Sequence, residues 1–574
     1  MLLRRSWSLW AALTTCLVVF FYRRRATESV PTNPLIEYIN PTSTNDKEFD
    51  WAKRPLNFPL QNIIHLPNRT VLPLPRIQYA FKPNYGAAAE ENERRREMVK
   101  SSFIRTWEGY KNRAWLKDEL RPISGASVNG LGGWAATLVD SLDTLWIMDL
   151  KVDFAQAVGT VEEIDFTRSE EEEVNVFETT IRHLGGLLAA RDLCGETTEE
   201  EHWKEVLTEK AVELGSFLYA AFDTPNRMPI TRWKWKNARD GKFQEAYTAV
   251  LLAEIGSMSV EFTRLSQLTG NPKFYDAIQR VTNRLEKAQE LTSLPGLWPV
   301  VVSPMEEDFG DNMAFSIGAM ADSTYEYLLK EYIMLGGRSM QYREMYNYAM
   351  DTAREHLFFR PRTISSIDIL ISGNRNVLSG TSGVLDPVGQ HLSCFAGGML
   401  AIGFKVFDRP DDLDIARKLL DGCLWAYRSM PTGIMPEIFH LTPCPDPENC
   451  AWVAEPHSED PKNFPEFFDI EDKRYILRPE AIESLFVLYR ITGDETLRDE
   501  AWKIFEAIEE HTKTESGNAA LSDVTRIPAP MDDSMETFWT GETLKYFYLI
   551  FSAPDLISLD EWVFNTEAHP LKRS

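Results

Sequence analysis

Apolar residues recur at three- and four-residue spacing along most of residues 83–574, which is the period of amphipathic helices and not of strands. Several predicted helices end in a short turn that contains Gly and leads into another helix. The clearest of these turns begin at Leu193, Leu268, Leu335 and Ile491, and less regular junctions lie near Asp149, Asp408 and Ala553. The pattern therefore predicts seven helical hairpins, one at each junction.

Each predicted hairpin leaves one apolar face uncovered, so a single hairpin cannot form a core by itself. Hairpins that stack side by side bury these faces in one continuous core. Loops that contain Pro follow several of the second helices, at Thr224, Leu294 and Pro431. An open α-solenoid and a closed barrel both satisfy this pattern. The residues alone therefore predict an all-α fold without choosing between the two.

The N-terminus carries a different pattern. Residues 7–22 form an apolar run with Arg4 and Arg5 before it and three arginines after it. We interpret this run as a signal anchor that follows a cytoplasmic tail of residues 1–6, although a membrane span usually needs ~17–25 residues. A cleaved signal peptide is the alternative, and the flanking arginines do not fix the orientation.

Residues 23–82 are rich in Pro, Asn and Thr and show no sustained period, which is typical of a stem between a membrane and a folded body. Asn68-Arg69-Thr70 is an acceptor sequence for N-glycosylation, a modification of the secretory lumen. We therefore predict a type II membrane protein whose lumenal body comprises residues 83–574.

Composition limits what this body can do. The chain of 574 residues is 44% hydrophobic and 11% aromatic, which is enough for a large core. Its formal net charge is −25, whereas a surface that binds nucleic acid needs an excess of Lys and Arg. A nucleic-acid partner is therefore not expected.

Three carboxylates stand in contexts that suit acid–base chemistry. Glu178 lies four residues before Arg182 on one face of a predicted helix. Asp322 and Glu480 each stand where a predicted helix begins. Each also has an ordinary structural interpretation: an exposed ion pair for Glu178, a helix cap for Asp322 and a helix-start residue for Glu480. Because the chain contains 86 Asp and Glu, composition cannot choose among them.

A polar cluster near the C-terminus, from Phe564 to Pro570, offers oxygen donors to a metal ion. Thr566 has a hydroxyl and a backbone carbonyl, both hard oxygen donors of the kind that Ca²⁺ prefers, and Glu567 is placed to hold the waters of a coordination shell. Taken alone, such a cluster is more often a capped and solvated C-terminus.

Six segments give these residues a common context. They are F-E-T-T-I-R at Phe177, A-D-S-T-Y-E-Y-L-L-K at Ala321, H-L-S-C-F-A-G-G at His391, R-P-E-A-I-E-S at Arg478, G-E-T-L-K-Y at Gly541 and F-N-T-E-A-H-P at Phe564. Together, and in this order, they resemble the class I α-1,2-mannosidases of glycoside hydrolase family 47, with a fungal character. The resemblance runs from about Ala80 to Leu571. It implies a closed (αα)7 barrel whose mouth holds an active site.

The resemblance implies that the protein hydrolyses terminal α-1,2-linked mannose from Man9GlcNAc2-type N-glycans with inversion. Glu178 is implied as the general acid, Glu480 as the base that activates water and Asp322 as the third essential carboxylate, with the division between Glu178 and Asp322 left open. Thr566 is implied as the protein ligand of one Ca²⁺. The residues implied to line the mannose pocket are Arg182, Glu261, His391, Arg478, Glu483, Phe538, Glu542 and Glu567. By its own context, His391 is equally a satisfied core histidine.

Of the six cysteines, Cys16 lies in the apolar run, which leaves five for the lumenal part. The resemblance implies a disulfide between Cys394 and Cys423. We also predict a pairing of Cys444 with Cys450 across a short Pro-containing loop, so that Cys194 remains a buried free thiol. Fully reduced cysteines would conflict with a lumenal location.

The chain departs from one branch of the family. Members of the endoplasmic reticulum that remove a single mannose carry Arg two residues before the aspartate of A-D-S, where this chain has Met320. Loss of a long hydrogen-bond donor from the cleft relaxes the choice among oligomannose branches. We therefore predict Golgi-type trimming of several mannoses, in a Golgi or endoplasmic reticulum membrane. A pocket peculiar to one lineage is the alternative explanation of Met320.

Two other functions remain open. One is a protein of the same fold that binds or weakly trims glycans in endoplasmic reticulum quality control, and the complete set of carboxylates argues against it. The other is a helical-repeat scaffold that binds proteins. Such a scaffold predicts neither metal dependence nor a cluster of Glu178, Asp322 and Glu480 at one end of the fold.

Overall fold

The computed structural model describes residues 49–70, 73–82, 86–310, 312–377, 383–446, 449–453 and 464–573. These residues belong to one compact unit that begins at Phe49. The predicted tail (1–6), the predicted anchor (7–22) and the first part of the predicted stem (23–48) lie outside the described residues. Within the described part of the chain, no helix is both long and apolar enough to cross a membrane.

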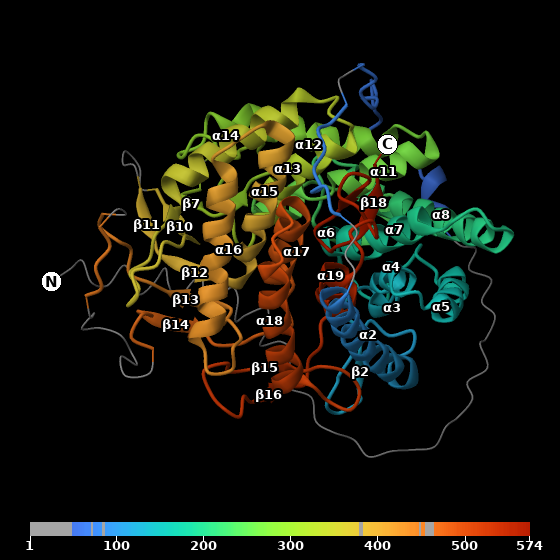
Figure 1. Ribbon diagram of the computed structural model, residues 1–574. Helices are drawn as coiled ribbons and strands as arrows, with labels where there is room; N and C mark the ends of the chain where they lie inside the picture. The colour runs from blue at the N-terminus through green and yellow to red at the C-terminus, as the bar shows by residue number, and fades with distance from the viewer. Residues whose placement is uncertain are drawn as a thin grey trace, which may run out of the picture. The chain divides into compact units, whose positions relative to one another are not determined.

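Six helical hairpins follow one another along the chain at predicted junctions (Figure 1). The inner helix of a pair is buried nearly all round, as in α13 (Asp322–Met334), which is buried from Ser323 to Met334. Because a helix of this kind faces protein on every side, the inner helices form the wall of the core. The six pairs are α4 (Leu142–Ile147) with α5 (Lys151–Glu163), α7 (Gly185–Leu193) with α8 (Thr198–Tyr219), α11 (Ser259–Thr269) with α12 (Lys273–Gln289), α13 with α14 (Met340–His356), α15 (Ala396–Phe407) with α16 (Asp412–Ser429), and α17 (Glu480–Thr492) with α18 (Thr496–Thr512).

The seventh pair joins the two ends of the body. The inner helix α19 (Leu544–Phe551) packs against α2 (Ala87–Arg113), the first long helix (Figure 1). The hairpin predicted near Ala553 is therefore wrong, because the chain after α19 forms the antiparallel strands β17 (Trp562–Phe564) and β18 (Pro570–Lys572). Since the first and last helices pair, the ring of hairpins is closed, and the predicted (αα)7 barrel is confirmed.

The connections that lead from each outer helix to the next inner helix carry short strands and helices. Two-stranded antiparallel pairs are β1 (Glu119–Leu120) with β2 (Ser127–Val128), β3 (Val174–Asn175) with β4 (Arg232–Trp233), β5 (Val250–Leu251) with β6 (Val301–Val302), β8 (Phe358–Phe359) with β9 (Ile371–Ser372), and β15 (Ala520–Leu521) with β16 (Met531–Asp532). The three-stranded sheets have the orders β11 (Val384–Asp386), β10 (Asn374–Asn376), β7 (Ala314–Phe315), and β12 (Val388–Gln390), β13 (Ile438–His440), β14 (Asp469–Asp472). Short helices are η1 (Trp51–Lys53), α3 (Ala136–Asp140), α6 (Val176–Glu178), η2 (Thr179–Leu184), η3 (Ala220–Phe222), α9 (Trp235–Arg239), α10 (Leu252–Gly256), η4 (His391–Phe395) and η5 (Trp539–Thr543).

The second part of the predicted stem, described for residues 49–70 and 73–82, belongs to the folded body. Trp51 is buried, and its indole N–H donates to the backbone carbonyl of Thr167 at 2.7 Å. A stem that spaces a body from a membrane would not bury a tryptophan, so the body begins well before residue 83. Asn68, in the predicted glycosylation sequence, is exposed on this segment.

Two disulfides fasten the connections. Cys394 in η4 is joined to Cys423 in α16, with 6.1 Å between their Cα atoms, and Cys444 is joined to Cys450, with 5.4 Å between theirs. Both Cα separations lie in the usual range for disulfides. Cys194 is a buried free thiol.

Candidate active site

The three predicted catalytic carboxylates lie at one end of the barrel. Asp322 is the first residue of α13, and Glu480 is the first residue of α17. Glu178 ends α6 and is followed by the π-helical segment η2, which leads into α7. Each inner helix is entered from the same end, so these helix N-termini, which carry partial positive charge, converge on one mouth. The structure therefore brings together three carboxylates that are up to about 300 residues apart in sequence.

Two left-handed backbone residues precede the carboxylate-bearing helices. Met320, two residues before Asp322, has a φ of 75°, and Leu477, three residues before Glu480, has a φ of 69°. A non-glycine residue in this region costs on the order of 1–3 kcal/mol, so the surrounding contacts must hold it. The carbonyl of Met320 accepts the backbone N–H of Ala253 at 2.9 Å.

Glu480 is held as a carboxylate by two basic neighbours. Its Oε2 lies 2.7 Å from Nδ1 of His391, whose Nε2 lies 2.7 Å from the hydroxyl oxygen of Tyr427. Its Oε1 lies 3.7 Å from a guanidinium nitrogen of Arg478. Burial alone would raise the pKa of Glu480, but the hydrogen bond with His391 and the charge of Arg478 lower that pKa below its usual value. Glu480 can therefore act as a base.

Asp322 has the opposite electrostatic environment. One of its oxygens accepts the backbone N–H of Ser323 at 2.8 Å. Burial and the negative charges of Glu326 and Glu480 raise the pKa of Asp322 to about 7. A carboxyl group with this pKa retains a proton near neutral pH, which a general acid requires.

Glu178 is paired with a buried arginine. Nε of Arg182 donates to Oε2 of Glu178 at 2.9 Å, and Nη1 of Arg182 donates to Oε2 of Glu567 at 3.2 Å. The guanidinium carbon of Arg182 lies 5.5 Å from the centre of the Phe538 ring. The side chain of Arg182 is 10% exposed and that of Glu178 is 28% exposed, so this ion pair is part of the site interior and not of the outer surface.

Three further predicted pocket residues form a buried carboxylate cluster. Burial raises the pKa of Glu483 and of Glu567 to about 8 each, and burial together with the negative charge of Glu567 raises the pKa of Glu542 well above its usual value. The ammonium group of Lys330 lies 3.8 Å from Glu483 and also contacts Glu326. Lys330 beside Glu483 and Arg182 beside Glu567 leave these pKa values raised, so the cluster favours a further positive charge.

The turn between β17 and β18 places Thr566 beside this cluster. The backbone N–H of Thr566 donates to the hydroxyl oxygen of Tyr327 at 3.3 Å, and Tyr327 donates to Oε1 of Glu261 at 2.6 Å. Oε2 of Glu261 is buried without a hydrogen-bond partner among the described protein atoms. Among the described residues, no three or more His, Cys, Asp or Glu side chains are placed so that they could hold a metal ion by themselves. The hydroxyl and carbonyl oxygens of Thr566, next to Glu567 in the chain, are hard donors that would fit a largely hydrated Ca²⁺.

Glu261, another predicted pocket residue, contacts the turn that carries Thr566. It is fully buried, and its Oε1 also accepts a hydrogen bond from Nδ2 of Asn565 at 2.8 Å. Its assignment to the mannose pocket stays a prediction.

Sequence reasoning missed two charged partners at the mouth. Glu437 accepts a hydrogen bond from Nε of Arg478 at 2.5 Å, and Glu254 on α10 accepts one from Nε of Arg232 at 3.0 Å. Glu437 ends a Pro- and Gly-containing loop, and nothing in that loop points to Arg478, which lies in a different connection. Met320, by contrast, is at the mouth as its sequence position suggested, and it is 37% exposed.

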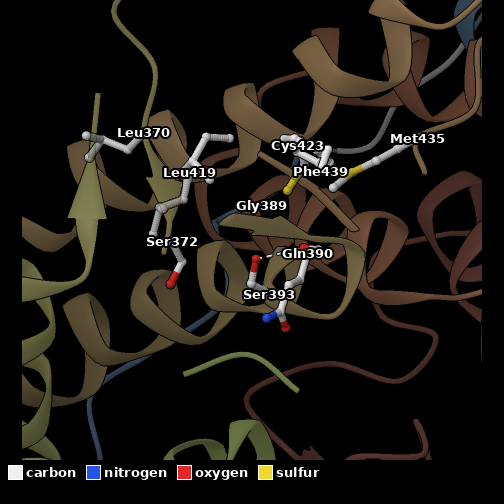
Figure 2. Close-up of a pocket in the computed structure, with 10 residues that line it drawn as sticks. Leu370, Ser372, Gly389, Gln390, Ser393, Leu419, Cys423, Met435 and Phe439 are labelled. Carbon is white, nitrogen blue, oxygen red and sulfur yellow. Dashed lines mark hydrogen bonds between the residues drawn. The ribbon is translucent and has the colours of Figure 1, made fainter. Parts of the chain in front are cut away.

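A small pocket lies beside the disulfide of Cys423 (Figure 2). Its lining includes Ser393, whose hydroxyl donates to the backbone carbonyl of Gln390 at 2.8 Å. None of the predicted catalytic or pocket residues lines it. The carboxylates, and not this pocket, therefore define the candidate active site.

Comparison with known proteins gives this arrangement a family. The sequence profile of glycosyl hydrolase family 47 matches residues 102–573. The chain belongs to glycosyl hydrolase family 47. The family 47 match includes Glu178, Asp322, Glu480 and Thr566, so all four stand inside the shared region.

Two relatives illustrate the breadth of the similarity. The mannosyl-oligosaccharide α-1,2-mannosidase IA of Spodoptera frugiperda is 34% identical over 492 residues, which cover 84% of this chain and 68% of the relative. The endoplasmic reticulum mannosyl-oligosaccharide 1,2-α-mannosidase of Mus musculus is 35% identical over 521 residues, which cover 89% and 73%. Only the second of these names gives a compartment, the endoplasmic reticulum, so membership of family 47 leaves the compartment of this chain open.

A solved structure supports the barrel independently. The α-1,2-mannosidase from Trichoderma reesei superimposes with a TM-score of 0.76 at 30% identity, covering 84% of this chain and 99% of that one. The shared region leaves out about a sixth of this chain.

Proposed function

We propose that this protein is a mannosyl-oligosaccharide 1,2-α-mannosidase that removes terminal α-1,2-linked mannose from high-mannose N-glycans with inversion. The observation that carries the proposal is the geometry of the barrel mouth: Glu480, hydrogen-bonded to His391, and Asp322 each begin an inner helix there, and their surroundings lower the pKa of Glu480 and raise that of Asp322 to about 7. An inverting glycosidase needs one ionised carboxylate to activate water and one protonated carboxyl group to protonate the leaving oxygen. The relatives named above supply the substrate class.

Glu480 is the proposed base. The carboxylate accepts a proton from water as the water attacks the anomeric carbon, and the hydrogen bond to His391 fixes the orientation of its Oε2. Tyr427, on the far side of the imidazole, fixes the ring in turn. This arrangement supplies an oriented base that remains ionised at mildly acidic pH.

Asp322 is the proposed proton donor. Glu178, together with Arg182, is proposed to orient the leaving group of the glycosidic bond. This assignment follows the raised pKa of Asp322 and the ion pair of Glu178 with Arg182. It revises the division of roles that the resemblance implied, in which Glu178 was the acid. Phe538 beside Arg182 offers an apolar face to a pyranose ring.

Thr566 is the proposed protein ligand of one Ca²⁺, with carboxylates such as Glu542 and Glu567 holding its waters. When bound, Ca²⁺ would orient sugar hydroxyls by direct coordination. The cluster of Glu483, Glu542 and Glu567 would be stabilised by this charge, because their mutual repulsion and burial oppose ionisation. The support for the metal is therefore electrostatic.

We further propose Golgi-type trimming within the secretory pathway, with the body lumenal and attached through residues 7–22. The support for broad trimming is Met320, which presents a partly exposed thioether where a guanidinium would restrict the cleft. The exposed Asn68 and the two disulfides suit a lumenal body.

The test is incubation of the folded body with Man9GlcNAc2, with and without a chelator, while released mannose is followed by proton NMR. We expect β-mannose first, because inversion at an α-linkage gives the β-anomer, and we expect chelation to stop release. Initial α-mannose would contradict the inverting mechanism, and undiminished release in chelator would contradict the metal assignment. Binding of glycan without release would favour a glycan-binding quality-control protein.

A further inference from the structure

Behind the proposed catalytic groups lies a buried series of side chains with alternating charge. Nζ of Lys545 donates to Oδ2 of Asp143 at 2.8 Å, and the same oxygen lies 2.9 Å from Nδ1 of His569. Nε2 of His569 lies 3.0 Å from Oδ1 of Asp140. All four side chains are fully buried. We call Lys545, Asp143, His569 and Asp140 the charge column.

The charge column ends at the arginine that holds Glu178. Oδ2 of Asp140 accepts a hydrogen bond from the hydroxyl of Thr537, and this hydroxyl accepts one from Nη1 of Arg182 at 3.0 Å. The same Nη1 lies 3.8 Å from Oδ2 of Asp140. Arg182 in turn donates to Glu178 at 2.9 Å. Positive and negative groups therefore alternate without interruption from the barrel interior to the mouth.

His569 carries a positive charge in this arrangement. Burial opposes the charged imidazole, but Asp143 and Asp140 raise the pKa of His569 to about 9. Both ring nitrogens then donate, one to each aspartate, and this fixes the two carboxylates relative to each other. A neutral side chain with donors on a single atom cannot reproduce this pair of hydrogen bonds to opposite aspartates.

The backbone is built to admit the charge column. A Cβ atom at Gly185 would lie 2.9 Å from Cδ2 of His569, and one at Gly541 would lie 3.0 Å from Cγ of Asp140. Glycine within a helix costs ~1 kcal/mol relative to alanine. Two helical segments therefore accept this cost so that His569 and Asp140 can lie where they do.

Stability alone does not account for so many buried charges. Replacement of a buried ion pair by apolar residues of similar volume is often neutral or stabilising, because desolvation offsets the attraction. An active site that must position a guanidinium group to within a fraction of an ångström, however, benefits from buried charges that hold this group in place. The residues of the charge column come from α3, α4, α19 and the turn before β18. The position of Arg182 is therefore fixed by contacts that lead to all of these segments.

We propose that Lys545, Asp143, His569 and Asp140 are positioning residues for the reaction: they fix Arg182, and through Arg182 they fix the carboxylate of Glu178. The inference rests on the proposed function. It assigns these four residues no contact with the substrate. Their replacement should therefore lower kcat much more than it changes KM.

The test variant is His569→Gln, which keeps one donor nitrogen, replaces the other with an acceptor oxygen and removes the charge. We expect kcat on an α-1,2-linked dimannoside to fall roughly 10- to 100-fold, as for other misplaced catalytic groups, with KM changed less than about threefold. Lys545→Met, at the far end of the column, should lower kcat in the same direction and by less. If His569→Gln does not fold, the kcat of Lys545→Met tests the proposal in its place.

A matched control is Arg264→Gln, which breaks a buried pair with Asp192 formed at 2.7 Å between α7 and α11. It should lower the melting temperature and leave kcat unchanged. A double-mutant cycle adds Arg182→Lys: if the column acts through Arg182, then His569→Gln should reduce kcat little further in that background. Fully additive losses in kcat would overturn the route through Arg182.

His569 lies in the same turn as Thr566, so an effect on Ca²⁺ binding must be separated from an effect on Arg182. Ca²⁺ affinity is measured by titration of the metal-free protein, followed by tryptophan fluorescence, and the loss of kcat in His569→Gln should persist at saturating Ca²⁺. A weakened affinity whose activity loss is rescued by saturating Ca²⁺ would overturn the proposal, as would a lowered melting temperature with unchanged kcat in His569→Gln and Lys545→Met. An inactive wild type would instead refute the proposed function and, with it, the column.

Discussion

Glu480 and Asp322 occupy the same position in their helices, the first residue, yet the protein shifts their pKa values in opposite directions. The helix dipole acts on both and cannot explain the difference. The difference comes from the neighbours: Arg478 lowers both pKa values, but only Glu480 has the hydrogen bond with His391, whereas Glu326 and Glu480 itself raise the pKa of Asp322. The ionised base thus helps to keep the acid protonated, so the two roles depend on each other.

Replacement of Glu480 tests the base directly. Glu480→Gln should abolish mannose release while glycan binding remains detectable, because an amide of equal size cannot accept a proton from water. Turnover and glycan binding should be measured on the same preparation, with the exposed Glu209→Gln as a control that retains full turnover. Retention of more than about a few per cent of turnover would remove Glu480 from the base role, since such a base contributes roughly 10²–10⁴-fold.

The pH dependence of kcat/KM tests the pair. Activity requires ionised Glu480 and protonated Asp322, so it should fall as pH drops below the lowered pKa of Glu480 and as pH rises through about 7. In Asp322→Asn the proton donor is lost, and kcat/KM should fall roughly 10²–10⁴-fold. A wild-type profile that stays flat from pH 6 to pH 9 would show that Asp322 does not supply the proton.

Met320 tests branch choice. Met320→Arg should slow removal of mannoses beyond the first and accumulate Man8 intermediates, while hydrolysis of a simple α-1,2-linked dimannoside is spared, because the change touches branch contacts and not the reacting ring. Met340→Arg, which changes another exposed methionine, at the start of α14, is the charge-matched control. The glycan ladder should be resolved by chromatography. An identical ladder for wild type and Met320→Arg would remove the main support for Golgi-type trimming.

At the scale of elements, the periodicity of apolar residues predicted the helices and the hairpins that consecutive helices form. Six of the seven junctions were placed correctly because each hairpin is formed by consecutive helices, and the Gly-containing turns at Leu268 and Ile491 end their helices with Gly270 and Gly493 in the left-handed conformation. The seventh was wrong because the partner of α19 is α2, and no local pattern reports a contact between the two ends of the chain. For the same reason, the pairing of Glu437 with Arg478 was missed.

The disulfide of Cys394 with Cys423 ties η4, which carries His391, to the outer helix α16. A cross-link between residues 29 apart should contribute about 3–4 kcal/mol by chain-entropy reasoning. The double variant Cys394→Ser/Cys423→Ser should therefore melt at a lower temperature. Cys194→Ser, which changes a buried free thiol, is the matched control and should melt close to wild type.

Thiol mapping completes that test. Mass spectrometry of the secreted body under non-reducing conditions should find Cys394 and Cys423 joined. Free thiols at both positions in the wild type, or equal melting temperatures for the double variant and wild type, would contradict a stabilising cross-link.

At the scale of the whole molecule, the pairing of α2 with α19 makes the body depend on its first helix. A fragment of residues 49–574 should fold and release mannose. A fragment of residues 83–574 should also fold but melt at a lower temperature, because it lacks the contacts of Trp51. A fragment of residues 114–574, without α2, should not fold, since one edge of α19 is left uncovered. Circular dichroism melts decide all three, and a folded 114–574 fragment would contradict the closure.

The same closure constrains how the protein is made. α2 leaves the ribosome hundreds of residues before α19, its only inner-helix partner among the pairs described above. Its buried positions, including Phe103 and Trp107, therefore have no completed binding surface while most of the chain is synthesised. Nascent chains that expose such surface are prone to aggregation and are bound by chaperones. The order of the elements thus makes final folding post-translational, completed only when the last helix can meet the first.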